Sequence, residues 1–216
     1  RYIYKGAFKE GKRSGVGQVD KVSFHYNGEW DNDFKTGYGK AKYKDGTIYE
    51  GEWEKDQRQG YGVCIYPDSQ IYTGSWKSNW RDGQGTLTYS NGNRYVGSWH
   101  KDQKEGEGTF YLQLDTVLYT GTWWRNKRHG KGTCYFIDTD EMYEGEWFLG
   151  QPHGEGEYKY KDNQNYRGSF VQGKRHGLGI FTYPDGDKYI GEFDNDLCSG
   201  KDGIFVFSDY GKYVGE

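Results

Sequence analysis

One short motif, Tyr-x-Gly-x-Trp or Tyr-x-Gly-x-Phe, recurs along the whole chain. It occurs nine times, with a tenth copy beginning at the end of the chain, and its tyrosines are Tyr4, Tyr26, Tyr49, Tyr72, Tyr95, Tyr119, Tyr143, Tyr166, Tyr189 and Tyr213. Neighbouring copies start 22 to 24 residues apart, a spacing typical of proteins built by repeating one small structural unit. The periodicity therefore predicts one continuous array over residues 1–216, with nine complete repeats and a truncated tenth.

A second motif, Gly-x-Gly, follows in each of the first eight copies, at Gly15/Gly17, Gly37/Gly39, Gly60/Gly62, Gly83/Gly85, Gly106/Gly108, Gly130/Gly132, Gly154/Gly156 and Gly177/Gly179. Glycine inside a strand marks a place where a bulky group approaches the backbone closely, and here we expect that group to be an aromatic ring. Asp45-Gly46, Asn91-Gly92 and Asp185-Gly186 lie between the second strand of one copy and the first strand of the next, where they predict tight turns.

Alternation along the motif identifies both elements as strands. In Tyr49-Glu50-Gly51-Glu52-Trp53 the aromatic and glycine positions share one face and the charges share the other. The predicted fold class is all-β: an elongated, single-layer antiparallel array of β-hairpins whose aromatic face forms a groove. We predict that a partner binds in this groove, lined by Trp30, Tyr49, Trp53, Tyr66, Tyr72, Trp76, Tyr89, Tyr95, Trp99, Tyr119, Trp123 and Trp147.

Composition narrows the function. A mean hydropathy of -1.11 with 28% charged residues is typical of disordered chains, but 19% aromatic residues favour a folded, thin structure. A net charge of -3 without an arginine-rich run argues against a nucleic-acid partner. No apolar stretch is long enough to cross a bilayer. Cys64 and Cys134 share a register three repeats apart, which predicts buried thiols in a reducing, cytoplasmic compartment.

Tyr-Glu-Gly-Glu-Trp at 49–53, Gly-Tyr-Gly at 60–62 and the step of about 23 residues resemble the MORN (membrane occupation and recognition nexus) repeat family over essentially the whole chain. The resemblance implies hairpin arrays that act as binding or scaffold modules in cytoskeletal, ciliary or membrane-contact proteins, in some cases fused to catalytic domains. The ninth copy departs from the pattern, with Gly200 and Gly203 in place of Gly-x-Gly.

Residues able to carry chemistry do not form a catalytic pattern. His129, His153 and His176 each precede a Gly-x-Gly, but consecutive copies are roughly 9–10 Å apart, too far to share one metal ion, so we interpret them as loop histidines. The glutamates of the charged face, Glu29, Glu52, Glu146 and Glu192, are expected to be solvated. We predict no enzyme activity, no catalytic residues, no metal and no cofactor.

A basic residue recurs five positions after the motif aromatic, which predicts a basic rim able to meet acidic phospholipids or an acidic partner: Arg13, Lys35, Arg58, Arg81, Lys104, Lys127, Arg128, Lys174 and Arg175, including two neighbouring lysines. The alternative is neutralisation within the same turn by Asp33, Asp56, Asp102 and Asp196. Phe34, Trp80 and Trp124 lie outside the motif and are candidate exposed hot spots.

These observations predict a non-enzymatic scaffold that holds a peptide or an amphipathic helix of a protein partner in its aromatic groove. We expect a cytoplasmic location, in a cytoskeletal, ciliary or membrane-contact assembly. Two alternatives are a membrane-docking module that uses the basic rim, and a regulatory array belonging to a larger enzyme. Unpaired sheet edges also allow end-to-end self-association.

Overall fold

The structure is a computed structural model that describes residues 2–113, 116–208 and 211–214. Two compact units make up the chain, and each is considered by itself. The first contains residues 1–106 and 111–115, and the second contains residues 107–110 and 116–216. Strand β10 (Gln103–Tyr111) supplies residues to both units.

Every strand of the first unit pairs antiparallel with the strand that follows it in sequence. The strands are β1 (Tyr2–Lys9), β2 (Lys12–Lys21), β3 (Phe24–Asp31), β4 (Phe34–Tyr43), β5 (Ile48–Glu54), β6 (Gln57–Ile65), β7 (Ile71–Lys77), β8 (Trp80–Thr88) and β9 (Arg94–His100).

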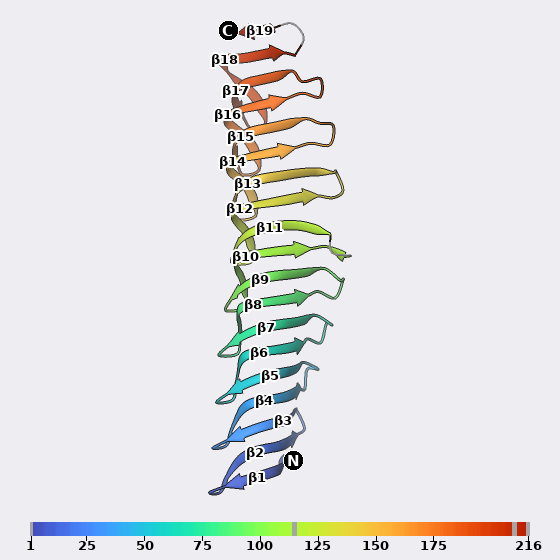
Figure 1. The fold of residues 1–216 in the computed structure, drawn as a ribbon, viewed down its shortest axis with the longest axis vertical. Helices are drawn as coiled ribbons and strands as arrows, with labels where there is room; N and C mark the ends of the chain where they lie inside the picture. The colour runs from blue at the N-terminus through green and yellow to red at the C-terminus, as the bar shows by residue number, and fades with distance from the viewer. Residues whose placement is uncertain (1, 114–115, 209–210, 215–216) are drawn as a thin grey trace. The chain divides into compact units, whose positions relative to one another are not determined.

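The second unit has the same succession of antiparallel neighbours (Figure 1). Its strands are β11 (Val117–Trp124), β12 (Lys127–Phe136), β13 (Glu141–Phe148), β14 (Gln151–Lys159), β15 (Asn165–Val171), β16 (Lys174–Thr182), β17 (Lys188–Asp194), β18 (Leu197–Phe207) and β19 (Gly211–Val214). The predicted all-β fold of antiparallel hairpin repeats is confirmed.

In the regular hairpins the motif glycine of the first strand lies opposite a glycine of the second strand, whereas the β17–β18 hairpin has a register shift at Gly191. In β5 and β6, Gly51 pairs with Gly62, and Tyr49 lies across both of them. A Cβ atom at Gly62 would collide with the Tyr49 ring, so the expected close approach of an aromatic ring is the reason for glycine at this position. The Tyr49 hydroxyl donates to the Glu52 carbonyl at 3.0 Å, which satisfies its polar end inside the fold.

The core is a continuous stack of edge-to-face rings within each unit. Tyr49 contacts Trp53 of its own repeat at 5.2 Å and Trp76 of the next repeat at 5.3 Å, measured between ring centroids. The indole nitrogen of Trp53 donates to the Gly39 carbonyl of the preceding repeat at 3.0 Å. Each ring therefore ties neighbouring repeats together, as expected when no single hairpin can bury its own apolar face.

Two kinds of turn connect the strands. The predicted tight turns at Asp45-Gly46, Asn91-Gly92 and Asp185-Gly186 are confirmed, with glycine φ values of 95°, 83° and 91°. The turns after the motif aromatic use two consecutive residues with positive φ, most of them not glycine, as at Asn32 (48°) and Asp33 (73°). Positive φ at both central residues is the type I′ pattern, which suits the twist of a hairpin and favours Asn and Asp.

Candidate binding surfaces

The side chains predicted to line an open groove form the core instead. Ten of the twelve are at most 7% exposed, because the Tyr and Trp rings pack on one another and on the glycine pairs. Tyr66 and Tyr89 are half-buried. Little surface of the motif aromatics is left for a partner, so the structure assigns them to stability first.

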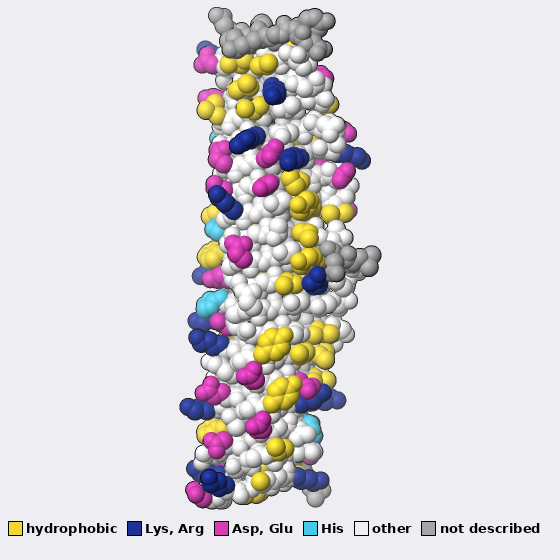
Figure 2. All heavy atoms as spheres, in the orientation of Figure 1, with side chains coloured by type: hydrophobic (Ala, Val, Ile, Leu, Met, Phe, Trp, Pro, Cys, Tyr) yellow, Lys and Arg dark blue, Asp and Glu magenta, His cyan; other side chains and the backbone are white. Residues whose placement is uncertain are grey.

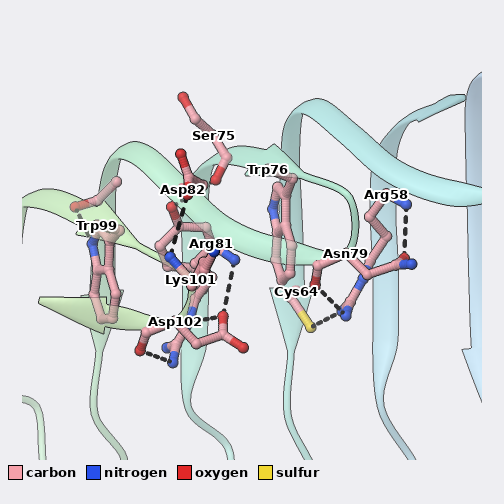
Figure 3. A network of polar contacts seen from close by, with 12 residues as sticks. Arg58, Cys64, Ser75, Trp76, Asn79, Arg81, Asp82, Trp99, Lys101 and Asp102 are labelled. Carbon is pink, nitrogen blue, oxygen red and sulfur yellow. Dashed lines mark hydrogen bonds and ion pairs between the residues drawn. The ribbon is translucent and has the colours of Figure 1, made fainter.

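Basic side chains cover this core. The Arg58 guanidinium lies 4.2 Å from the centroid of the Trp76 ring, and the Arg81 guanidinium lies 4.3 Å from that of Trp99 (Figure 3). Each basic residue therefore stacks on the aromatic ring of the following repeat, a cation–π contact that stabilises most when it is partly desolvated. Lys35 makes the same contact with Trp53 at 4.5 Å.

Acidic turn residues neutralise this layer, but not within the same turn. Asp102 Oδ1 accepts from both the backbone nitrogen and Nε of Arg81 at 2.9 Å, and the Asp102 backbone nitrogen donates to the Arg81 carbonyl at 3.0 Å. The carboxylate thus comes from the next repeat, 21 residues further on. The prediction of neutralisation within one turn is wrong, because the turns of successive repeats lie side by side in the sheet.

The same pairing joins Asp33 to Arg13, Asp56 to Lys35 and Asp196 to Arg175. The basic side chains of the three pairs are only 14–22% exposed. They are consequently packed and paired, and of the predicted rim only Lys127 and Lys174 are exposed. Such a layer offers an acidic membrane few accessible charges.

Lys104 occupies the position in its repeat that Lys35 and Arg81 occupy in theirs, and burial removes its ammonium group from water. Its Nζ donates to the Tyr89 hydroxyl at 3.1 Å and lies 5.2 Å from the Tyr95 ring centroid. Burial, with a further contribution from the Arg81 charge, lowers the pKa of Lys104 to about 8. Burial also lowers the pKa of Lys35, where the Asp56 carboxylate opposes the shift.

A row of five rings and one valine follows the turn end of the second unit; Trp124, Phe148, Val171 and His176 are exposed, and His129 and His153 are half-buried. We call this row the turn-end ladder, and its residues are Trp124, His129, Phe148, His153, Val171 and His176. Centroid distances are 5.6 Å from Trp124 to His129, 5.4 Å from His129 to Phe148, and 5.6 Å from Phe148 to His153. At its left edge Figure 2 shows a histidine side chain between two groups of hydrophobic side chains, at about the level of β10 to β12.

The three histidines of the ladder lie in strands β12, β14 and β16, so their interpretation as loop histidines is wrong. They share one face of the sheet with Trp124 and Phe148, because each is brought beside the last residue of a neighbouring first strand. Among residues 2–113, 116–208 and 211–214, no group of three or more His, Cys, Asp or Glu side chains is placed to hold a metal ion.

The position that directly follows the motif aromatic has other residue types in the first unit. The residue after the motif aromatic is Trp124, Phe148 or Val171 along the ladder, whereas five earlier repeats have Lys9, Asp31, Glu54, Lys77 and His100. His100 Nδ1 lies 3.1 Å from a carboxylate oxygen of Asp82. Apolar residues at this register are therefore not a requirement of the hairpin repeat.

A polar trough lies beside the ladder on the same face of the second unit. It has a volume of about 920 Å³ and is lined by residues of strands β10 to β15. Its charged lining consists of Glu107, Glu144, Glu146, Glu155 and Glu157 against Lys131 and Arg167. Glu146 and Phe148 are two residues apart on β13, so the acidic trough and the apolar ladder are adjacent rows.

The first unit exposes a separate set of hydrophobic side chains. Tyr38 and Tyr61 are 55% and 57% exposed on the glutamate face, and Figure 2 shows hydrophobic side chains gathered at the level of β4 to β8. The Glu52 carboxylate accepts from the Tyr61 backbone nitrogen at 2.8 Å, so this face is partly ordered by its own glutamates. The predicted hot spots Phe34, Trp80 and Trp124 are 48%, 50% and 39% exposed.

The fold and the repeated Tyr–Gly–Trp packing define a β-hairpin repeat protein. A model of the MORN repeat matches residues 4–19, 26–48, 49–71, 72–94, 95–113, 119–141, 143–164, 166–188 and 189–212, so the chain belongs to the MORN repeat family. No curated protein matches the chain.

Among solved structures, the chain resembles the wild-type TCP10 domain of Danio rerio CPAP, with 13% identity, a TM-score of 0.45 and coverage of 89% of this chain and 94% of that one. The same domain in complex with a peptide of Danio rerio STIL gives 14% identity, a TM-score of 0.39 and the same coverage. Both TM-scores are low, so these likenesses carry no functional argument for this chain. The described residues contain no helix that is long and apolar enough to span a membrane.

Proposed function

We propose that the chain is a protein-binding repeat module whose second unit contacts its partner through the turn-end ladder. Ten of the twelve predicted groove aromatics are buried, and the basic rim apart from Lys127 and Lys174 is packed against the core. Trp124 and Phe148, by contrast, are 39% and 52% exposed and lie in one row with His129 and His153. Exposed aromatic residues in a contiguous row are typical of interaction sites.

The observation that carries this proposal is the internal comparison between repeats. Glu54 and Lys77 occupy the register of Phe148 in repeats with the same core, so folding does not require an aromatic ring there. A solvent-exposed Trp and Phe at this register therefore need a reason outside the chain. Contact with a partner protein supplies one, because aromatic side chains contribute most to interface affinity.

Site-specific photo-crosslinking tests the proposal. A benzoylphenylalanine residue is introduced in place of Phe148, and in a matched control in place of Glu54, which has the same register in the first unit. In extract of the source cells we expect a heterologous protein to be crosslinked at position 148 and not at position 54. Equal crosslinking at both positions, or none at 148, contradicts the proposal.

A second substitution gives the experiment an independent readout. Trp124→Ser should reduce crosslinking at position 148, because both rings belong to one row. Trp80→Ser, an exposed tryptophan of the first unit, should leave it unchanged. Crosslinking only to a second copy of this chain would indicate self-association through the ladder and would also contradict a heterologous partner.

A further inference from the structure

We infer that the ladder binds a proline-rich segment in the polyproline II conformation, with basic residues on the edge of the segment that faces the acidic trough. This inference rests on the proposed function, and it specifies the chemistry of the partner at the same surface. Three properties of the described residues support it: the spacing of the ladder, its width and the charge beside it.

Spacing is the first property. Equivalent positions of consecutive repeats are separated by two strands, or about 9.6 Å. Three residues of polyproline II rise about 9.3 Å, so every third residue of such a segment can meet successive positions of the ladder. Seven residues of an α-helix rise about 10.5 Å, which departs further from the repeat.

The width of the ladder distinguishes a polyproline II segment from an amphipathic helix more sharply than its spacing does. An amphipathic helix presents an apolar stripe at least two columns wide. The ladder is one column: on one side the next row contains Glu146 and Glu155, and on the other side the turn residues are Arg125, Leu149 and Gln172, of which only Leu149 is apolar. A helix would rest half of its apolar face on charged groups, whereas polyproline II has three edges and places only one of them on the rings.

Ring packing also suits a polyproline segment. Neighbouring ladder rings are tilted by 41° to 48° with centroids 5.4–5.6 Å apart, so they present a ridged, aromatic-lined surface. Aromatic-lined surfaces of this kind recognise polyproline II, which costs little conformational entropy to bind because it is preformed. Beyond His153 the row continues past Val171 to a hollow of about 240 Å³ that Lys174 and His176 help to line.

The charge of the trough determines which residues the bound segment carries and which of its edges faces the trough. The trough has five glutamates against two basic residues, and its Glu146 lies two residues from Phe148 on the same strand. Arginine or lysine on the inner edge of the segment would meet these carboxylates in a partly enclosed surface. An acidic segment would meet repulsion there, so the trough selects by charge as well as by contact.

The inference is tested by selecting 12-residue peptides from a random display library on the intact chain, with counter-selection on Phe148→Lys. Lysine is the natural residue at this register in the first unit, at Lys77, so the variant keeps a side chain that the fold accepts. Thermal unfolding of the variant checks that it is folded. Selected sequences are then synthesised with a fluorescent label and measured by anisotropy.

We expect the selected peptides to carry proline or another apolar residue at every third position, with Lys or Arg between them. Their affinity should fall at least about tenfold with Phe148→Lys, equal to about 1.4 kcal/mol. A similar fall is expected with Glu146→Gln combined with Glu155→Gln, and added salt should weaken the wild-type complex because the charges are only partly buried. Trp80→Ser should change neither affinity nor salt dependence.

Other outcomes separate this inference from the function on which it rests. Peptides that need Phe148 but are helical or acidic would overturn the polyproline assignment and leave the ladder as a protein-binding site. Peptides that bind Phe148→Lys as tightly as the wild type would overturn both. Failure to enrich any sequence over the counter-selection would also overturn the polyproline assignment.

Discussion

The two units have cores of the same construction and differ on their surfaces. Trp76 in the first unit and Trp147 in the second are both 3% exposed, and each accepts a stacked guanidinium, from Arg58 and Arg128. One position beyond the tryptophan the units diverge, with Lys77 in the first and Phe148 in the second. Packing thus constrains the register of the ring and leaves the next, outward-facing register free for specialisation.

The turns differ as well. In the first unit Asp33, Asp56 and Asp102 are the second of two positive-φ residues, and each pairs with a basic residue of the preceding repeat. In the second unit Gly150 and Gly173 occupy this place and supply only backbone, so Arg128 donates to the Gly150 carbonyl at 3.3 Å, whereas Asp196 pairs with Arg175 as in the first unit. The turn requires a positive φ at this residue in every repeat, and only some repeats place a carboxylate there.

The largest expected loss of stability comes from removing a buried tryptophan, and it tests whether the cores of the two units are equally stabilised by their rings. Trp76→Ala and Trp147→Ala should each lower the free energy of unfolding by about 3–5 kcal/mol, because each removes a buried ring from the stack. Denaturant unfolding measures both. A loss below about 1 kcal/mol for either would show that the two cores are not equivalent.

A smaller effect is expected from the carboxylates of the turns. Asp102→Ala should destabilise by about 2 kcal/mol, because it removes the acceptor of Arg81 and places alanine at a φ of 66°. Asp102→Asn is the matched control, since Asn79 holds Arg58 in the same way with an N–O distance of 2.9 Å. We expect the asparagine variant to stay within about 0.5 kcal/mol of the wild type. Equal losses for both variants would mean that the ion pair, and not the acceptor geometry, stabilises the turn.

Lys104 predicts a pH dependence that originates in the first unit. The pKa is lowered from 10.5 to about 8 in the folded chain, so between these values the unfolded chain binds more protons. Stability should therefore rise as the pH increases from about 8 towards 10, since the cost of holding a buried ammonium is fully present below that window and fades through it.

Unfolding by urea across this window measures the effect of Lys104. Lys104→Met removes the titrating amine and should flatten the rise. The second unit has Arg128 and Arg175 at the equivalent positions, and arginine does not titrate in this range. An unchanged slope in the Lys104→Met variant would assign the rise to another group.

The smallest stability effect concerns the exposed tryptophans. Trp80→Ser and Trp124→Ser should each change the free energy of unfolding by no more than about 0.5 kcal/mol, because both side chains are largely outside the core. Differential scanning calorimetry measures this. If only Trp124→Ser also weakens partner binding, the second unit and not the first contains the binding surface. A loss above about 1 kcal/mol for Trp124→Ser would indicate that its contacts with Arg125 and His129 stabilise the turn itself.

Much of the fold could be predicted from the sequence, because the information is local and repeated. Alternation in Tyr49-Glu50-Gly51-Glu52-Trp53 gives strand and face, and Asp45-Gly46 gives the turn that joins hairpins. These features depend only on residues a few positions apart. Nine copies of the same local signal made the hairpin array evident before any tertiary contact was considered.

The surface could not be derived in this way. Whether Trp76 lines an open groove depends on Arg58, which lies eighteen positions earlier and covers the ring, and whether Arg81 is free depends on Asp102, which lies 21 positions later. The type I′ turns carried a usable signal, an Asn or Asp at the second turn position in most repeats, but its partner in the preceding repeat was not evident. The ladder was missed because His129 and Phe148 belong to different repeats and meet only across strands.

The sequence by itself determined the repeating hairpin, the inward face and the need for glycine beneath each tyrosine, because strand alternation and local sterics act over a few residues. Only the tertiary structure decided which of these side chains remain exposed. Burial and charge pairing depend on the neighbouring repeat, about 23 residues away in sequence and about 10 Å away in the sheet. Aromatic residues inside the repeat therefore became core, and those at the turn end became surface.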